Sequence, residues 1–223
     1  MRIRTGYSAA FGDSAMYVMT YPMEFRDIQS CYPILFTKDP NTGGFFAAAL
    51  FGFEADQNLF LKDNGWDATY VPALVQRQPF LIATGAEGDN TTPVVSLDLD
   101  HPRVSQDEGE ALFDDEGEPS DLLNGKIALL ENLHRGLQHG TGFIDTLLKH
   151  QLLEQITLDL TFNDGRQISV QGFYCIAEER LYQLKGDVLE SLNMAGYLQP
   201  VFMAVASLSR IRDIIERRNR LRA

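Results

Sequence analysis

Two runs of alternating apolar and polar residues, joined by a short turn, are the clearest pattern in the chain. In the first run Ile156, Leu158, Leu160 and Phe162 alternate with Thr157, Asp159 and Thr161. After Asn163-Asp164-Gly165-Arg166 the alternation resumes with Ile168 and Val170. An Asp-Gly pair between two alternating runs is a strong signal for a tight turn between antiparallel strands. The pattern therefore predicts a β-hairpin.

Shorter apolar runs separated by turn residues fill the first half of the chain. They predict strands at residues 17–19, 34–37 and 93–100, and the continuous apolar run 45–53 predicts a buried strand. Residues 70–82 are extended in character, but Pro72 and Pro79 interrupt them. Because proline cannot donate to a strand ladder, we expect an edge strand or an ordered irregular segment there.

Helical spacing dominates after Pro119. Pro119-Ser120-Asp121 is a typical helix start, with Ser120 or Asp121 as the cap. The apolar positions that follow at helical spacing are Leu122, Leu123, Ile127, Leu130 and Leu133. We expect Gly140-Thr141-Gly142 to end this helix, a second helix at 143–153 and further helix at 178–192. Residues 198–205 predict a strand, and residues 207–222 an amphipathic closing helix.

These elements predict an α+β fold, because strands and helices do not alternate regularly. We expect a mixed or antiparallel sheet in the N-terminal half, with helices and the β-hairpin in the C-terminal half. No repeat or low-complexity linker divides the chain, so residues 1–223 are expected to form one domain. The change of character at Pro119 allows a subdivision into a strand-rich part, 1–118, and a helix-rich part, 119–223.

Charge is concentrated in one region. The formal net charge is −12, and residues 87–121 contain 12 acidic residues against the single basic residue Arg103, which leaves −1 for the rest of the chain. Such a surface is a poor partner for nucleic acid. No apolar run approaches the roughly 18 residues of a membrane-spanning helix, and no signal peptide is recognisable. We therefore expect a cytoplasmic protein.

The C-terminus is basic, with two readings left open. Its arginines are Arg210, Arg212, Arg217, Arg218, Arg220 and Arg222. The structural reading is a terminal helix whose arginines complement the helix dipole. The functional reading is a basic tail that contacts RNA, lipid headgroups or an acidic partner.

Recognisable catalytic and cofactor motifs are absent from the sequence. There is no phosphate-binding glycine loop and no GxSxG elbow, so no catalytic residue and no cofactor is assigned. Cys31 and Cys175 form no CxxC pair, and Cys175 has the setting of a buried structural thiol. The residues of an acidic loop, 114–118, do not have EF-hand spacing. A metal site would require distant groups among His101, His134, His139 and His150 to converge, so none is assigned.

The aromatic stretch 58–80 is the most distinctive part of the sequence. It holds the single tryptophan, Trp66, with Asp67, Tyr70 and Arg77. In the structural reading the aromatic residues anchor the core, and Arg77 pairs with a carboxylate such as Glu24 or Asp67. In the functional reading the stretch is a rigid surface that binds a peptide or small molecule, since Trp, Tyr and Arg dominate binding hot spots.

The same stretch carries a family resemblance. The elements involved are Glu24-Phe25, Tyr32-Pro33-Ile34-Leu35-Phe36, Asn58-Leu59-Phe60, Trp66 with Tyr70-Val71-Pro72-Ala73, Arg77 with Pro79-Phe80, and Gly109-Glu110-Ala111-Leu112-Phe113-Asp114. In this order they resemble the bacterial SapC family, although Gln76 and Gln78 stand where the family usually has Arg and Tyr. The resemblance adds Tyr32 and Glu24 to the candidate ligand-binding residues.

What the resemblance implies is an accessory role rather than a reaction. Members occur in gene neighbourhoods with flavin-dependent tryptophan halogenases, cupin-like oxygenases and TonB-dependent receptors. The leading hypothesis is therefore a non-catalytic binding or accessory protein of a bacterial uptake or modification system, which holds a peptide, a small molecule or a partner enzyme. The alternatives are a metal-dependent oxygenase-like or hydrolytic enzyme and a structural assembly subunit, for example of a homo-oligomer.

Overall fold

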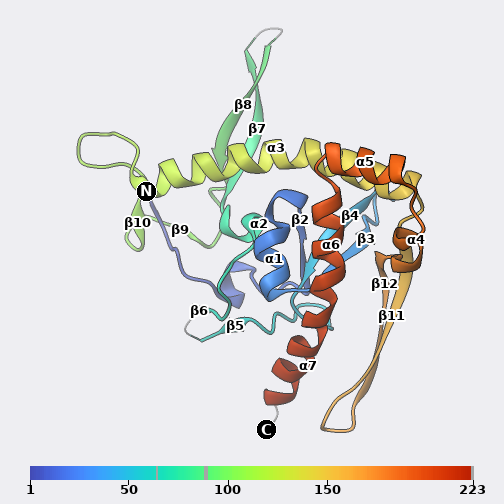
Figure 1. Ribbon diagram of the computed structural model, residues 1–223. Coiled ribbons are helices and arrows are strands. Elements are labelled where there is room, and N and C mark those ends of the chain that lie inside the picture. Colours follow the sequence, from blue (N-terminus) through green and yellow to red (C-terminus); the bar gives the residue numbers. More distant parts are fainter. Residues whose placement is uncertain (64, 88–89, 222–223) are drawn as a thin grey trace.

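A five-stranded antiparallel sheet forms the centre of the molecule in the computed structural model, which describes residues 1–63, 65–87 and 90–221 (Figure 1). Its strands, in spatial order, are β11 (Leu153–Thr161), β12 (Gln167–Ile176), β3 (Ile34–Lys38), β4 (Phe45–Leu50) and β2 (Tyr17–Thr20). The predicted hairpin is confirmed as β11–β12, with Gly165 in the left-handed conformation that its turn requires. The α+β class with antiparallel sheets is also confirmed.

One strand pair joins the two halves of the sequence. Strand β12 pairs with β3 through Phe173 opposite Thr37 and Tyr174 opposite Phe36. The Thr37 hydroxyl reinforces this contact by donating to the Gly172 carbonyl, 3.0 Å away. The sheet thus takes strands from both sides of residue 119, and a single domain over residues 1–223 remains the prediction that we carry forward.

Smaller two- and three-stranded sheets surround the central one. They are β10–β1–β9, with β1 (Arg2–Ile3), β9 (Val104–Ser105) and β10 (Glu110–Ala111); β5–β6, with β5 (Leu61–Lys62) and β6 (Gly65–Trp66); and β7–β8, with β7 (Phe80–Glu87) and β8 (Asn90–Leu97). The β7–β8 hairpin projects away from the body above the longest helix (Figure 1). Asn64, between β5 and β6 in the sequence, lies outside the described residues.

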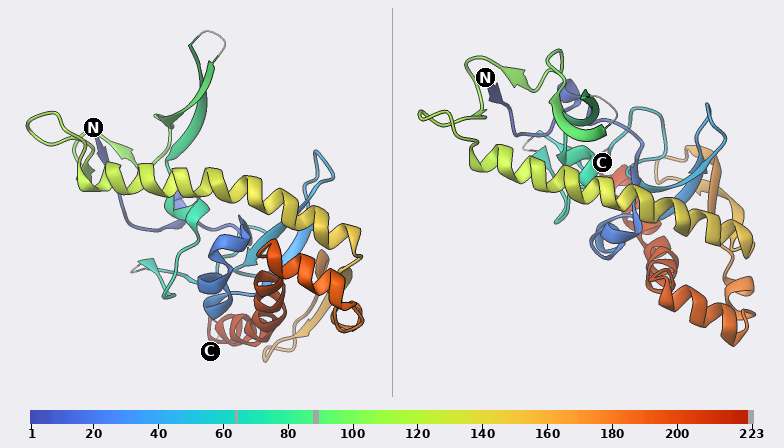
Figure 2. Two further views of the ribbon diagram at one scale, coloured as in Figure 1. Left: turned by 45° about the horizontal axis from the view of Figure 1, so that its top comes forward. Right: turned by 90° about the horizontal axis from the view of Figure 1, so that it is seen from above.

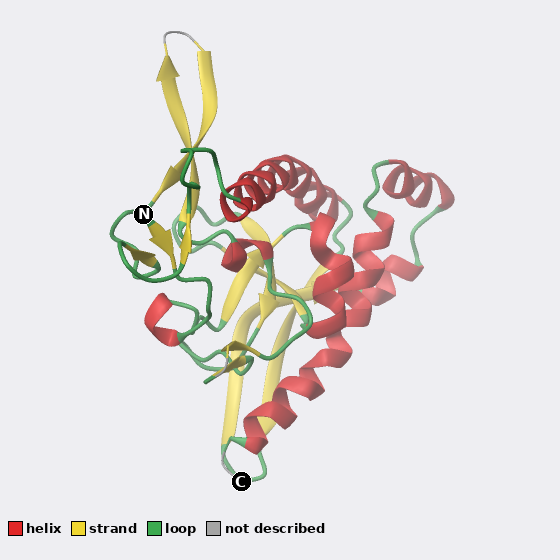
Figure 3. Ribbon diagram, turned by 90° about the vertical axis from the view of Figure 1, so that its left-hand side faces the viewer, coloured by secondary structure: helices red, strands yellow, loops and turns green. Residues whose placement is uncertain are grey.

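The helices lie mostly on one side of the central sheet, as the side view shows (Figure 3). They are α1 (Phe25–Cys31), α2 (Ala73–Gln76), α3 (Asp121–Lys149), α4 (Glu178–Tyr182), α5 (Gly186–Met194), α6 (Leu198–Ser207) and α7 (Ile211–Arg220), with short 3-10 turns at Ala9–Phe11, Pro22–Glu24 and Leu208–Arg210. The helical stretch expected at 178–192 is divided into α4 and α5. The closing helix is confirmed up to Arg220, while Arg222 lies outside the described residues.

Helix α3 is longer than predicted, because Gly140-Thr141-Gly142 does not end it. A Cβ atom at residue 140 would lie 3.0 Å from Cδ1 of Tyr21, and one at residue 142 only 2.5 Å from the Tyr197 hydroxyl. These glycines therefore let neighbouring aromatic side chains approach the helix. The packing offsets their low helix propensity, which costs about 1 kcal/mol per glycine relative to alanine.

The 29 residues of α3 connect two hydrophobic clusters. Phe143 and Leu147 belong to the main core around the sheet, whereas Leu130 and Leu133 belong to a second core. The other buried members of that second core are Ile3, Ala73, Phe80 and Leu112. Ser120 caps the start of the helix by accepting a hydrogen bond from the Leu123 amide. In both views of Figure 2 the helix runs along the width of the molecule, so one rigid element holds both cores.

Two expectations about local structure are wrong. Residues 198–205 form the helix α6 rather than a strand. Pro200 stands in its first turn, where no amide donor is needed, and Val201 and Ala204 are buried at helical spacing. Residues 70–82 do not form one extended segment, because the short helix α2 precedes β7. Short runs that are apolar on all sides carry no periodicity that separates helix from strand.

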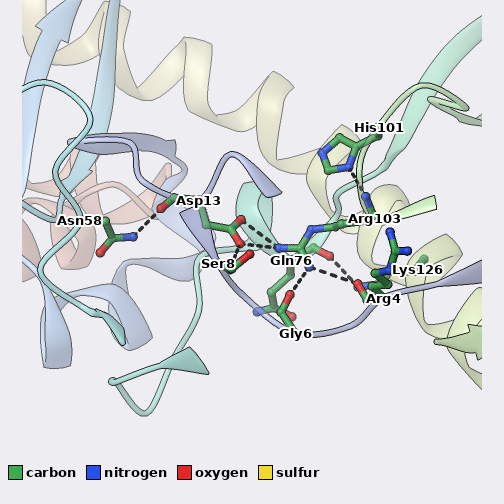
Figure 4. Close-up of polar contacts among 9 residues, drawn as sticks. All are labelled: Arg4, Gly6, Ser8, Asp13, Asn58, Gln76, His101, Arg103 and Lys126. Atoms are coloured by element: carbon green, nitrogen blue, oxygen red, sulfur yellow. Dashed lines mark hydrogen bonds and ion pairs between the residues drawn. The ribbon is translucent and has the colours of Figure 1, made fainter. Parts of the chain in front are cut away.

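A buried ion pair attaches the N-terminal segment to the loop before β9 (Figure 4). Both oxygens of the Asp13 carboxylate accept from the Arg103 guanidinium, at 2.9 and 2.7 Å, and the two side chains are almost fully buried. The guanidinium also donates to the backbone carbonyls of Arg4 and Gly6. It lies 4.8 Å from the centre of the Phe11 ring, within cation–π range. Every part of this arrangement depends on both charges being present.

Replacing one partner of this pair should therefore destabilise the protein strongly. We expect Asp13→Ala to lower the free energy of unfolding by about 3–5 kcal/mol, because it leaves a buried guanidinium without its carboxylate. Urea denaturation followed by circular dichroism measures this change. The matched control is Glu108→Gln, which breaks the exposed pair with Arg4 and should cost less than ~1 kcal/mol. Equal effects of the two substitutions would contradict a stabilising role of the buried pair.

Candidate functional site

A cavity of about 480 Å³ lies where the end of α1, strand β6 and helix α7 meet. We call it the Trp66 pocket, and its lining residues are Ser30, Cys31, Phe60, Trp66, Asp67, Ala68, Thr69, Arg210, Asp213 and Arg217. Three segments that are far apart in the sequence contribute to it. Its volume is within the range of small-molecule sites.

Trp66 is held in place by its neighbours on several sides. Its strand β6 pairs with β5 through Leu61. The indole meets the ring of Phe51 edge to face at 5.2 Å and that of Tyr7 at 5.5 Å. Its Nε1–H donates to the Tyr32 hydroxyl, 2.7 Å away. Because the ring is fixed by both packing and a hydrogen bond, the face of the pocket that it forms is rigid.

Behind Trp66 a chain of hydrogen bonds leads into the core. The buried Tyr32 accepts from Trp66 and donates to the Tyr70 carbonyl. Burial raises the pKa of Tyr32 well above its usual range, although the hydrogen bond from Trp66 acts in the opposite direction. The Tyr32 hydroxyl therefore stays protonated and remains the donor that holds the backbone at Tyr70.

The chain ends at Glu24, a buried carboxylate with three donors. The Thr20 and Tyr70 hydroxyls donate to it at 2.7 and 2.8 Å, and the Ala73 amide donates at 3.0 Å. Burial and the nearby charge of Glu24 both raise the pKa of Tyr70, which keeps its hydroxyl protonated. A buried carboxylate that accepts three hydrogen bonds is a fixed structural centre rather than an open ligand site.

Two arginine–carboxylate pairs form the polar side of the pocket. Arg217 donates to the Asp67 carboxylate at 2.6 Å and to the Asp67 carbonyl at 3.0 Å, while its guanidinium lies 4.2 Å from the centre of the Phe60 ring. Arg210 donates to Asp213 at 2.9 Å. The formal charges of these four side chains cancel. The pocket thus presents both signs of charge beside an aromatic surface.

Cys31 contributes a thiol to the same cavity. Its Sγ lies 3.1 Å from the Thr69 hydroxyl and 3.3 Å from the Ser30 hydroxyl. Burial alone would raise its pKa, but hydrogen bonds from Ser30 and Thr69 and from the backbone at Tyr70 and Thr69 outweigh it, so the pKa is lowered. This residue was not singled out from the sequence, although it directly precedes the Tyr-Pro element that contains Tyr32.

The candidate residues thus separate into three groups. Trp66 and Asp67 line the pocket, whereas Tyr32 supports it from behind. Glu24 and Tyr70 also border a smaller cavity of about 170 Å³ on the other side of the hydrogen-bond chain. Arg77 forms the third group, because it lines neither of these two cavities.

The expected pairing of Arg77 with Glu24 or Asp67 is wrong. Its guanidinium donates to the Phe80 carbonyl at 2.7 Å, and burial lowers its pKa, opposed by the nearby Tyr21. Asp67 is bound by Arg217 instead. The correct partner of Asp67 is 150 residues away in the sequence, so no local pattern could have indicated it.

The histidines do not converge. His134 and His139 lie on α3 and His150 follows it, whereas His101 lies in the loop before β9 and accepts from the Arg103 amide. Among the residues that the structure describes, no three His, Cys, Asp or Glu side chains are grouped so that they could hold a metal ion.

The C-terminal arginines are largely used within the fold. Besides Arg210 and Arg217, Arg218 is buried, with its guanidinium 4.8 Å from the centre of the Phe162 ring. Arg220 pairs with Glu216 one turn earlier. These contacts favour the structural reading of the basic terminus over a free basic tail.

A family model described as SapC matches residues 1–214. The chain belongs to the SapC family. The match covers every residue that lines the Trp66 pocket except Arg217, which lies just beyond it. No curated protein and no solved structure is significantly similar to this SapC chain. Within the described residues, no helix is both long and apolar enough to cross a membrane.

The two thiols should differ strongly in reactivity. Burial raises the pKa of Cys175 to about 11, with a further contribution from Glu154, whereas the pKa of Cys31 is lowered. At pH 8 only about one thousandth of Cys175 is thiolate, the form that reacts. We therefore expect iodoacetamide to modify Cys31 at least about tenfold faster than Cys175.

Peptide mass spectrometry over time measures the two rates. Thr69→Val, which removes the hydroxyl beside Cys31, should slow modification of Cys31 and leave Cys175 unchanged. Faster modification of Cys175 would show that the thiol environments are not those described here.

Proposed function

We propose that this protein is a binding or accessory protein whose Trp66 pocket holds a small zwitterionic molecule or a peptide segment with both a carboxylate and an ammonium group. The observation that carries this proposal is the combination of the half-buried Trp66 ring with two arginine–carboxylate pairs in one cavity. A ligand with a negative charge at one end and a positive charge at the other complements both the arginines and the carboxylates of the pocket.

The polar groups of the pocket retain capacity for a ligand. Arginine has five N–H donors, and Arg210 uses only Nη1 for Asp213 among the contacts of the described residues. The carboxylates of Asp67 and Asp213 each accept from one arginine through a single oxygen. A carboxylate could thus bind to Arg210, and an ammonium group to Asp67 or Asp213. The indole ring of Trp66 supplies contact area for the organic part.

The rigidity of Trp66 supports binding. Its hydrogen bond to Tyr32, and the bond from Tyr32 to the Tyr70 carbonyl, hold the wall of the pocket before a ligand arrives. Side chains that are ordered in advance lose less conformational entropy on binding. The hydrogen-bond chain ending at Glu24 thus acts on affinity indirectly, by positioning Trp66.

The other hypotheses receive less support from the geometry. A metal-dependent enzyme would need histidines that converge, and His101 lies in a different part of the fold from His134 and His139. An assembly subunit would bury Phe60 and Trp66 between chains, but Phe60 is already buried within one chain. A partner enzyme remains compatible with the proposal, because a charged peptide segment of a partner is one form of the ligand.

The single tryptophan makes the proposal directly testable. We expect Trp66 fluorescence to change saturably when free amino acids or dipeptides are added at millimolar concentrations, with little response to acetate or methylamine alone. Arg210→Gln should weaken binding by about tenfold or more, since it removes a charge-assisted hydrogen bond. The matched control is Arg212→Gln, two residues further along the chain in the first turn of α7 but outside the pocket.

The same titration separates binding from a purely structural role. The Arg210→Gln variant should keep the unfolding midpoint of the natural protein within a few degrees, because Arg210 is on the surface. If no zwitterion changes the fluorescence of Trp66, or if Arg212→Gln weakens binding as much as Arg210→Gln, the proposed function is wrong.

A further inference from the structure

A second cavity lies at the opposite end of α1 from the Trp66 pocket. Its volume is about 390 Å³, and it lies between the first turn of α1, the middle of α3 and the start of α6. We call it the Arg26 pocket. Its polar side chains are Arg26, Arg135, His139 and Gln199. In Figure 1, α1 and α6 lie side by side, and α3 crosses above them.

The charge in this pocket is unbalanced. None of the described residues that line it is Asp or Glu. Across residues 1–63, 65–87 and 90–221, neither Arg26 nor Arg135 takes part in an ion pair. This contrasts with the Trp66 pocket, where each arginine faces a carboxylate. Arg26 and Arg135 are both exposed, and two guanidinium groups without a carboxylate give this cavity a local positive charge that favours an anionic ligand.

Both arginines have hydrogen-bond donors to spare. Arg135 donates to the Asn132 side chain at 2.6 Å and to the Glu131 carbonyl at 3.4 Å, which leaves its Nη1 free for a ligand. Arg26 has no side-chain hydrogen bond to any residue that the structure describes. The hydrogen bond to the Asn132 side chain holds Arg135 on the surface of α3. A planar guanidinium with free N–H groups fits the oxygens of a phosphate in a bidentate manner.

Two glycines, Gly136 and Gly196, line the pocket, and a third, Gly142, shapes the surroundings of His139. Gly142 leaves room for the Tyr197 hydroxyl, and the Tyr197 ring lies edge-on to His139 at 4.9 Å. The His139 ring also contacts the Ala195 carbonyl at 3.4 Å. Gly196, with φ of +73°, lets the chain turn from α5 into α6 beside this ring. His139 is thus held in a defined orientation at the edge of the cavity.

The start of α6 borders the same side. Its first residue follows Tyr197, and no side chain caps the helix. The first turn contains no acidic residue. The unsatisfied amides at a helix start attract negative charge, in agreement with the two arginines. The main positive charge of the pocket comes from Arg26 and Arg135, and the helix start adds to it.

We propose that the Arg26 pocket binds the phosphate group of a small phosphorylated molecule. A phosphate monoester carries close to two negative charges at neutral pH, which match the two arginines, whereas one carboxylate would leave one of them unbalanced. The cavity is larger than a phosphate ion, and Met23, Met203 and Pro200 provide apolar contacts for the organic part of the ligand. This site is separate from the Trp66 pocket and does not depend on the function proposed for that pocket.

Isothermal titration calorimetry with inorganic phosphate and with glycerol 3-phosphate tests this proposal, with sodium chloride at matched ionic strength and glycerol as blanks. We expect saturable binding at one site, tighter for glycerol 3-phosphate than for inorganic phosphate. Arg26→Gln and Arg135→Gln should each weaken binding by about tenfold or more. Arg212→Gln and Arg210→Gln should leave it unchanged, and the latter separates this site from the Trp66 pocket.

Proton NMR of the natural protein locates the site without any substitution. The ring signals of His139 should shift on addition of glycerol 3-phosphate, while those of His101, in a different part of the fold, should not. Binding that does not saturate, or that all four variants weaken equally, would overturn the site. Succinate binding as tightly as glycerol 3-phosphate would overturn its assignment to phosphate.

Discussion

The need to satisfy one buried carboxylate determines much of the architecture around the Trp66 pocket. Glu24 lies in the 3-10 turn before α1, and its three donors come from β2, from Tyr70 and from the start of α2. An unsatisfied buried carboxylate would be very unfavourable, so these segments must meet at one point. Tyr70 then presents its carbonyl to Tyr32, which in turn receives Trp66. Trp66, at the end of this chain of hydrogen bonds, forms one face of the pocket.

The helix α1 relates the two cavities to each other. Its first turn carries Arg26 and its last residue is Cys31, so each end of seven residues borders a different pocket. The two pockets have different electrostatics. Around Trp66 the arginines are neutralised by carboxylates of the same chain, whereas around Arg26 they are not. One short helix thus separates a site suited to balanced charge from a site suited to negative charge.

The sequence predicted elements with their own local signal and missed those decided by distant contacts. The β11–β12 hairpin follows from alternation and an Asp-Gly turn, and the start of α3 follows from Ser120. The glycines at 140 and 142 resemble a helix end, because nothing local shows that Tyr21 and Tyr197 need their space. Likewise, the apolar residues 198–205 carry no periodicity that indicates a helix.

The residues of the candidate site also divide into those that the local sequence indicates and those that only distant contacts bring together. Trp66 and Asp67 were identified from composition, since aromatic and charged residues rarely cluster without a reason. Arg210 and Arg217 were visible only as part of a basic terminus, and Cys31 only as one of two cysteines. Their common pocket depends on α7 folding back against β6, a contact that spans about two thirds of the chain. Arg77 was assigned to a carboxylate on the basis of charge, whereas its actual acceptor is the backbone carbonyl of Phe80, which no side-chain pattern indicates.

The pairing of β12 with β3 has a consequence for synthesis on the ribosome. When β2, β3 and β4 have emerged, one edge of β3 has no partner until residues 167–176 follow more than a hundred residues later. At ~5–20 residues per second this interval lasts on the order of ten seconds. Throughout it the chain presents an open strand edge beside the apolar run of β4, which is the kind of surface that chaperones bind and that other nascent chains can join. Completion of the sheet, and with it the protection of this edge, thus waits for the last third of the protein.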